Sequence, residues 1–205
     1  MMGPQACGKG TQGRMLSAAL GIPLVTNGEL LRNLSDTHPY KKLISSQMNK
    51  GELVDQKFVA QIIKDRISKP DCANGYILDG WMRKDIDLDY FYPPLDYVIL
   101  ITLPREESLK RISGRRVCDL DGKTVNILTQ DPEEFEYCDG HLSQRPDDNE
   151  NAVNRRLDIF YTDTMHVINQ FKAKNKVIEV SGLGTPEEVF SRIEEQLVKK
   201  GVPLQ

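Results

Sequence analysis

The stretch "GPQACGKGTQ", residues 3–12, determines which fold this sequence predicts. Gly3 and Gly8 allow a tight turn, and Lys9 stands at the start of a segment whose apolar residues recur at helical spacing. Glycines let backbone N–H groups point inward, the helix N-terminus adds positive partial charge, and the lysine adds a full charge. The stretch therefore predicts a loop that binds a phosphate group and opens a helix.

The residue after the lysine raises a question about the ligand. Gly10 stands where the common magnesium-holding form of this loop has Ser or Thr, and Thr11 follows it. A tight turn without any ligand is the alternative, but the Gly-x4-Gly-Lys spacing at a helix start favours phosphate binding. The loop alone does not identify the phosphate.

Composition narrows the class of protein. The chain has 205 residues, which favours one domain, and its net charge of −3 offers no broad basic surface, so we expect no nucleic-acid partner. The longest largely apolar run, residues 97–103, has the length of a strand and is too short to span a bilayer. We therefore expect no membrane association.

The pattern of elements predicts an α/β fold. Apolar runs typical of buried strands cover residues 75–80, 97–103 and 176–180. Helical patterns cover residues 8–20, 28–34, 40–49, 55–67, 104–112, 150–172 and 186–199. Such alternation implies a parallel sheet covered by helices on both faces. Residues 114–149 break the rhythm with short alternating patches and turn pairs, which predicts a small β flap.

Five further motifs accompany the loop along the chain. They are "VTNGELLR" (25–32), "KGELV" (50–54), "YILDGWMR" (76–83), "RISGRRV" (111–117) and "QRPDDNENAVNRRL" (144–157). In order and spacing, the set resembles the adenylate kinases, a family of nucleoside monophosphate kinases, in the form with a long lid. The resemblance extends from residue 3 to about residue 198. In this family Gly-Thr after the loop lysine is the usual form, which accounts for Gly10 and Thr11.

The resemblance implies the architecture and the reaction. We expect a P-loop three-layer sandwich with a central parallel sheet, in one domain with its core at residues 1–26, 56–113 and 150–205. A helical insert at 27–55 is expected to bind the nucleoside monophosphate, and residues 114–149 form the lid. The implied reaction is the reversible transfer of the terminal phosphoryl group of ATP to AMP, giving two ADP. The implied cofactor is Mg²⁺ with ATP, and the implied state is a monomer.

Arginines suit this reaction because their planar forks bind phosphate oxygens. By resemblance, Arg32 and Arg83 hold the phosphate of the acceptor. The groups expected around the transferred phosphoryl are Lys9, Arg115, Arg145 and Arg156. Asp147 and Asp148 resemble lid carboxylates that pair with these arginines, although acids at a helix start are also common for other reasons.

The remaining site residues follow from the same resemblance. ATP is expected at Gly3, Gly8, Lys9, Gly10 and Thr11, with Arg111 stacked on its adenine. The acceptor is expected at Asn27, Arg32, Leu53, Val54, Gly80, Arg83 and Asp87. Asp79 and Glu29 are expected to act on Mg²⁺ through its water shell. Leu53 and Val54 are equally consistent with an ordinary core position.

The sequence departs from the family pattern at several positions. Ala6 stands where the family has Gly, and its methyl group is strained if that position requires a positive φ. Trp81-Met82 replaces Phe-Pro before the arginine of the acceptor motif. Asn27 and Asp87 replace Thr and Gln. An ionised carboxylate only accepts hydrogen bonds, which matches the amino edge of adenine or cytosine.

These departures leave two alternatives open. One is a kinase that prefers another monophosphate, such as CMP. The other is a nucleotide-binding protein of this fold without turnover.

The four cysteines do not form the dense pattern of a small secreted domain, so a reducing compartment, the cytoplasm, is expected; an organelle stays open. Some long-lid relatives bind structural zinc through paired cysteines. Here Cys118 is followed at the right spacing by Asp121, but the partner position of Cys138 is Phe135, which leaves a tetrahedral site one ligand short. We therefore expect no structural zinc.

Overall fold

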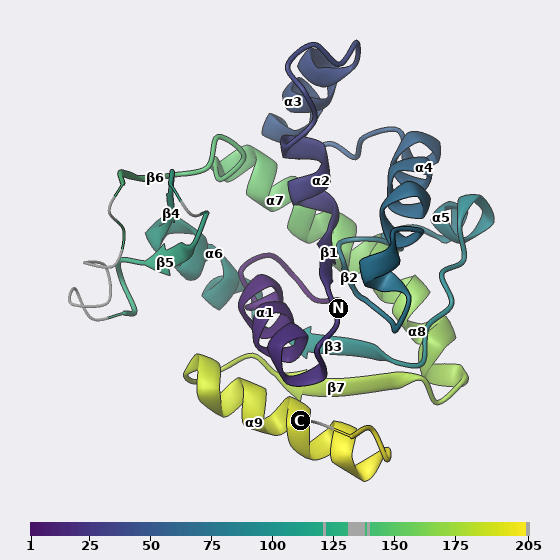
Figure 1. Cartoon of the computed structure of the whole chain (residues 1–205). Helices are drawn as coiled ribbons and strands as arrows, with labels where there is room; N and C mark the ends of the chain where they lie inside the picture. Colours follow the sequence, from purple (N-terminus) through teal and green to yellow (C-terminus); the bar gives the residue numbers. More distant parts are fainter. Residues whose placement is uncertain (121, 131–137, 139, 204–205) are drawn as a thin grey trace.

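The computed structural model describes residues 1–120, 122–130, 138 and 140–203. Its main sheet is parallel and built from two pairs of strands (Figure 1). β1 (Leu24–Thr26) pairs with β2 (Ile77–Asp79), and β3 (Val98–Thr102) pairs with β7 (Val177–Ser181). The first two residues lie between the pairs: Met2 forms a parallel bridge with Leu100, and the Met1 ammonium donates to the Leu78 carbonyl at 2.7 Å.

Helices cover both faces of this sheet, as the alternating pattern predicts. The helices are α1 (Lys9–Leu20), α2 (Asn27–Arg32), α3 (Lys41–Asn49), α4 (Gln56–Ile67), α5 (Asp85–Tyr90), α6 (Arg105–Gly114), α7 (Glu150–Ile159), α8 (Met165–Ala173) and α9 (Pro186–Lys199). A 3-10 turn, η1, spans Pro70–Cys72, and a π-helical turn, η3, spans Phe160–Thr164 between α7 and α8. The parallel strands between layers of helices agree with the predicted fold class.

Two clusters of buried side chains form the core, one on each face of β3. Ile99 and Ile101 belong to the cluster that includes residues of α1 and α9. Val98 and Leu100 belong to the cluster that includes residues of α2, α3, α4 and α8. Successive side chains of a strand point to opposite faces, so this continuous apolar run fills both clusters.

Helix caps explain why two boundaries agree with the prediction. Asp55 precedes α4 and accepts a hydrogen bond from the Phe58 N–H at 2.9 Å. Thr185 precedes α9 in a capping box with Glu188, and Pro186 occupies the first turn. Such caps satisfy N–H groups that the helix itself leaves free.

The predicted β flap is present as a second, antiparallel sheet. Its strands are β4 (Arg115–Cys118), β5 (Thr124–Asn126) and β6 (Leu142–Ser143), in the order β5-β4-β6. Figure 1 shows this sheet beside α6, apart from the main sheet. A disulfide joins Cys118 to Cys138. The expectation of reduced cysteines is therefore wrong for this pair, whereas Cys7 and Cys72 are buried free thiols.

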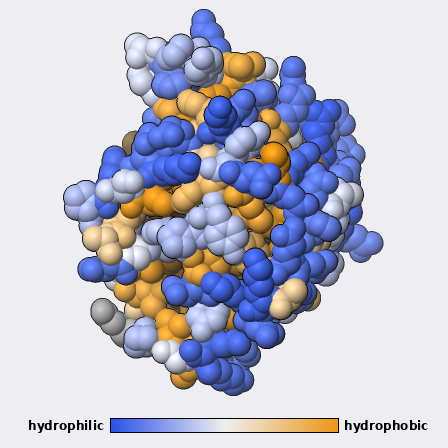
Figure 2. Space-filling view, turned by 90° about the vertical axis from the view of Figure 1, so that its right-hand side faces the viewer, coloured by the Kyte–Doolittle hydropathy of each residue, from blue (hydrophilic) through white to orange (hydrophobic). Residues whose placement is uncertain are grey.

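The surface agrees with the charged composition. Figure 2 shows a face whose rim is mostly hydrophilic, with apolar side chains gathered in hollows nearer its centre. Among the described residues, no helix is long and apolar enough to cross a membrane.

Candidate active site

The loop before α1 has the backbone that phosphate binding requires. Gly3, Ala6 and Gly8 all have positive φ, at 149°, 58° and 98°. A Cβ atom on Gly3 would lie 2.4 Å from the Ile101 carbonyl oxygen and 2.6 Å from the Cys7 sulfur, so only glycine fits there. Among the described residues, no side chain caps α1 at Gly8, and the first turn carries no acid. The positive end of this helix is therefore free of a competing carboxylate.

Lys9 closes the loop with its ammonium group. Its Nζ donates to the carbonyl oxygens of Gly3 at 2.7 Å and Pro4 at 2.8 Å, and lies 3.5 Å from the Cys7 sulfur. Gly10 and Thr11 follow in the first turn of α1, as predicted. The ammonium thus lies over the inside of the loop, where an anionic phosphate would exchange for the two carbonyl contacts.

Ala6 has the strained conformation that the sequence suggested. Its φ of 58° lies in the left-handed region, which costs a residue with a Cβ about 1 kcal/mol or more. The methyl group packs against a small apolar cluster of Ile112, Val153 and Leu157. This burial offsets part of the strain, so alanine is tolerated here.

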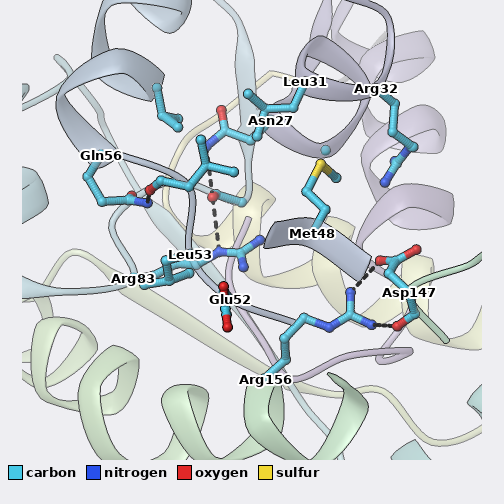
Figure 3. A pocket seen from close by; sticks show the side chains of 14 residues that line it. Asn27, Leu31, Arg32, Met48, Glu52, Leu53, Gln56, Arg83, Asp147 and Arg156 are labelled. Atoms are coloured by element: carbon cyan, nitrogen blue, oxygen red, sulfur yellow. Dashed lines mark hydrogen bonds and ion pairs between the residues drawn. The ribbon is translucent and has the colours of Figure 1, made fainter. Parts of the chain in front are cut away.

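A cavity forms between the helical insert, β2 and α7 (Figure 3). We call it the insert cavity; its lining consists of Asn27, Gly28, Leu31, Arg32, Met48, Glu52, Leu53, Val54, Gln56, Val59, Gly80, Arg83, Asp147 and Arg156. One part of the lining is apolar, whereas Arg32, Arg83 and Arg156 reach in from three different elements. Such a lining fits a ligand with a flat apolar end and an anionic end.

The insert cavity joins six of the predicted acceptor residues. Asn27, Arg32, Leu53, Val54, Gly80 and Arg83 all line it. The sequence did not single out Leu31, Met48, Gln56 and Val59, which also contribute to the lining. Leu31, Met48 and Val59 are apolar positions of α2, α3 and α4, and this pattern points to the cavity only once the insert is known to cover a ligand.

A second cavity lies beside the phosphate loop, and we call it the loop cavity. Its lining consists of Met1, Met2, Gly3, Gln5, Lys9, Gly80, Trp81, Arg83, Arg156, Ile159, Phe160 and Thr164. Gly80, Arg83 and Arg156 line both cavities. The two arginines therefore lie where a phosphate held by the loop and a phosphate held by the insert would meet.

Arg83 is a buried cation, and its surroundings shift its pKa. Burial lowers the pKa of Arg83, and the nearby Arg156 guanidinium lowers it further. Asp79, Asp87 and Asp147 act in the opposite direction. A buried cation with a second cation beside it is a site that an anion would stabilise.

Two lid carboxylates hold two arginines. Arg115 makes a two-point contact with Asp148, whose side chain is fully buried, with Nε donating to Oδ2 at 2.7 Å. Arg156 donates to Asp147 Oδ2 at 2.6 Å and lies 3.6 Å from Asp148 Oδ1. Burial alone would raise the pKa of Asp147, but the surrounding guanidinium groups, that of Arg156 foremost, lower it. The structure thus brings together the acids and arginines that the sequence paired.

Arg145 has no carboxylate within ion-pair distance among the described residues. Its Nη2 donates a long hydrogen bond, 3.3 Å, to the Thr124 hydroxyl. Burial, together with the nearby cations Arg115 and Arg32, lowers the pKa of Arg145 to about 10. The group remains protonated at neutral pH and is available for an anionic ligand.

Asp79 and Glu29, the predicted magnesium residues, differ in their surroundings. Asp79 ends β2, is 7% exposed, and its Oδ1 has no hydrogen-bond partner among the described residues. A buried carboxylate oxygen without a partner fits a site that a hydrated cation completes. Glu29 is exposed on α2 and lines neither cavity.

Arg111 and Asp87 lie outside both cavity linings. Arg111 lies in the last turn of α6, where its Nε donates to Glu107 at 2.8 Å. The Asp87 side chain is fully buried at the start of α5, and its Oδ2 accepts from the N–H groups of Arg83 and Lys84 at 2.7 and 3.0 Å. In this structure Asp87 serves the backbone of Arg83.

The described part of the lid holds no metal cluster of three His, Cys, Asp or Glu side chains. The disulfide uses both sulfur atoms that a zinc ion would need. Asp121 and Phe135, the positions that the sequence pairs with these cysteines, lie outside the described residues.

Comparison with known proteins identifies the family. The family model described as adenylate kinase matches residues 1–176. A curated adenylate kinase of Streptomyces avermitilis is 37% identical, with 98% of this chain and 96% of that protein aligned. Adenylate kinases of Methanocella arvoryzae and Caldicellulosiruptor bescii are 36% and 35% identical, over 97% and 98% of this chain and the same shares of those proteins. The chain therefore belongs to the adenylate kinase family.

Proposed function

We infer that this chain transfers the terminal phosphoryl group of ATP to AMP and forms two ADP in a reversible reaction. The family and the full-length relatives support this activity. The observation that carries it is the sharing of Arg83 and Arg156 between the insert cavity and the loop cavity. Transfer requires two anionic substrates in line, and these arginines lie at the place where the two would meet.

The residues divide into three groups by the substrate they hold. The loop backbone at Gly3–Gly8, Lys9 and the start of α1 hold the phosphates of ATP, and Arg111 contacts its adenine. Arg32 and Arg83 hold the phosphate of AMP. Arg115, Arg145 and Arg156 neutralise the transferred group, with Asp147 and Asp148 fixing their direction. The protein thereby supplies position and charge rather than a nucleophile.

Asn27 offers a recognition group for the base. Its side-chain N–H donates to the Gly80 carbonyl at 2.9 Å, which leaves its oxygen directed elsewhere. That oxygen is buried and has no partner among the described residues, and Asn27 lines the insert cavity. An acceptor at this place matches the exocyclic amine of adenine. Cytosine carries a comparable amine, so CMP is the competing acceptor to include in any assay.

Mg²⁺ accompanies ATP in this family, and it supplies charge neutralisation of the phosphate oxygens when bound. Asp79 fits this role because its buried Oδ1 lacks a partner among the described residues. Glu29 is exposed and lines neither cavity, so Asp79 is the residue on which this proposal rests.

The division into a core, an insert at 27–55 and a lid at 114–149 is our proposal for the moving parts. Closing both over the substrates excludes water, which would otherwise accept the phosphoryl group. We also propose a monomer that acts in the cytoplasm. The Cys118–Cys138 disulfide is the observation that weighs against a reducing compartment.

Replacement of the loop lysine tests the proposal. Lys9→Met removes the ammonium and keeps the aliphatic chain, so we expect loss of ADP formation by a protein that still folds. Lys69→Met, at an exposed lysine outside both cavities, is the matched control and should turn over as the parent does. Parent-like turnover in Lys9→Met would contradict the assignment of the loop.

A further inference from the structure

The backbone of Arg83 is held from both sides. Its N–H donates to Asp87 Oδ2 at 2.7 Å, and its carbonyl oxygen accepts from the Thr164 hydroxyl at 3.0 Å. Both partners are buried, with Thr164 5% and Asp87 0% exposed. Contacts to both polar atoms of one peptide residue fix its place more tightly than either contact alone.

Arg83 belongs to no helix or strand, because β2 ends at Asp79 and α5 begins at Asp85. The turn between β2 and α5 contains two residues of positive φ, Gly80 at 90° and Met82 at 59°. For a residue with a side chain, the left-handed conformation is about 1 kcal/mol or more higher in energy than the right-handed one. Such strain persists only where surrounding contacts impose it. The two hydrogen bonds to the Arg83 backbone are contacts that can impose this strained turn.

Thr164 comes from a distant and unusual part of the chain. It lies 81 residues from Arg83 and ends the π-helical turn Phe160–Thr164. Figure 1 shows α7 and α8 as successive parts of one helical run, and this turn joins them. π turns are rare and occur frequently at functional sites.

The π turn changes which residues face the strained turn. Thr164 contacts residue 83, and the preceding Asp163 forms an ion pair with Lys84 at 3.1 Å. Thr162, in the same turn, is exposed, and its hydroxyl lies 2.9 Å from the Asp158 carbonyl oxygen and 3.0 Å from Asp163 Oδ1 rather than near Arg83. Two successive residues of the π turn thus meet two successive residues of the strained turn.

We propose that Thr164 is a positioning residue for phosphoryl transfer, which holds the carbonyl of Arg83 so that the guanidinium stays where the two cavities meet. The proposal rests on the proposed function, because it assigns the Arg83 guanidinium to the AMP phosphate. The proposal also assigns a role to the π turn. Arg156 lies on α7, and the π turn that follows α7 ends at Thr164, which holds Arg83.

The alternative is a purely structural role, in which the Arg83 carbonyl only satisfies the hydrogen-bonding need of the buried Thr164 hydroxyl. In that case its loss would lower stability and affect both substrates alike. A positioning role predicts a larger effect on AMP than on ATP, because Arg83 is assigned to AMP, even though Thr164 and Arg83 also line the loop cavity beside the phosphate loop.

The test compares four variants by steady-state kinetics, calorimetric binding of AMP and chemical denaturation. Thr164→Val and Thr164→Ala remove the hydroxyl, Thr164→Ser keeps it, and Thr162→Val is the matched control on the same turn. We expect the first two to lose about tenfold in kcat/KM for AMP, which corresponds to one hydrogen bond, with KM for ATP changed by less than about twofold. Thr164→Ser should restore the parent values, and Thr162→Val should match the parent.

Three results would overturn the proposal: kcat/KM for AMP equal to that of the parent in Thr164→Val or Thr164→Ala, equal losses for both substrates, or no rescue by serine. Calorimetry separates this failure from failure of the proposed function. If the parent binds AMP without turnover, the proposed function fails. The positioning role of Thr164 is then tested by the AMP affinity of its variants alone.

Discussion

The contact between the insert and α7 at Gly51 can be tested by adding one atom, the Cβ of an alanine. The φ of Gly51 is 70°, and a Cβ atom there would lie 2.4 Å from the Ala152 carbonyl oxygen and 2.7 Å from the Ala152 Cα. Both atoms are backbone at the start of α7, so no side-chain rotation relieves the overlap. Gly51→Ala must therefore move the insert or α7.

The magnitude has two parts. The left-handed φ costs an alanine about 1 kcal/mol, and the overlap adds about 1–3 kcal/mol as in other overpacked sites. Separation would also weaken the 2.9 Å hydrogen bond from Asn149 to the Asn49 carbonyl and the 2.9 Å ion pair of Arg155 with Glu52. We expect a total loss of about 2–4 kcal/mol in the free energy of unfolding.

Gly201→Ala isolates the overlap. Gly201 has a similar φ of 77°, but nothing lies within 4 Å of the place that a Cβ atom would occupy, so this variant pays only the backbone cost. Chemical denaturation gives the two stabilities, and a coupled assay of ADP gives KM for AMP and for ATP. Gly51→Ala should raise KM for AMP, because displacement of the insert or of α7 changes the insert cavity that both line, while Gly201→Ala leaves KM unchanged. Equal stability losses and an unchanged KM for AMP would refute this reasoning.

Three further predictions concern single groups. Burial raises the pKa of Asp87, so the folded protein binds its proton more tightly than the unfolded chain does, and stability falls as pH rises from about 4 through the folded-state pKa. Asp87→Asn keeps an oxygen for the two N–H groups and should remove this slope in chemical denaturation, whereas an unchanged slope would contradict it. Replacing Cys118 and Cys138 together by Ser opens a link with a sequence separation of 20, and the lid should lose about 3 kcal/mol and be cleaved faster by protease; reductant should reproduce this in the parent. Asn149→Ala removes the cap that accepts the Ala152 N–H at 3.0 Å and should cost about 1 kcal/mol in urea denaturation, whereas parent-like stability would contradict the capping role.

Much of the fold could be predicted because local patterns carry it. The apolar run at 97–103 and the capped helices at 56–67 and 186–199 appear within a residue or two of their expected places. β1, at Leu24–Thr26, was missed because three residues carry too little periodicity to be distinguished from a loop.

The site could be predicted where a residue lies within a continuous motif. Lys9, Arg32, Arg83 and Arg156 were found this way; Lys9 and Arg32 each line one cavity, and the other two line both. Thr164 was missed because its importance depends on a π turn and on a partner 81 residues away, and neither leaves a local pattern.

Two other features depend on tertiary structure in the same manner. The carboxylate of Asp87 was assigned to the base from its place in a motif, whereas the fold directs it to the backbone of Arg83. The Cys118–Cys138 disulfide joins two positions within the flap, and spacing along the chain does not indicate whether two such thiols meet.

The most direct test of the central claim is a coupled assay of ADP formation from ATP and Mg²⁺, with AMP, CMP, UMP and GMP offered separately. The account predicts turnover with AMP, two ADP formed for each AMP consumed, and a much lower kcat/KM with the other three acceptors. Preference for CMP or another acceptor, or no turnover by folded protein that binds ATP, would contradict it.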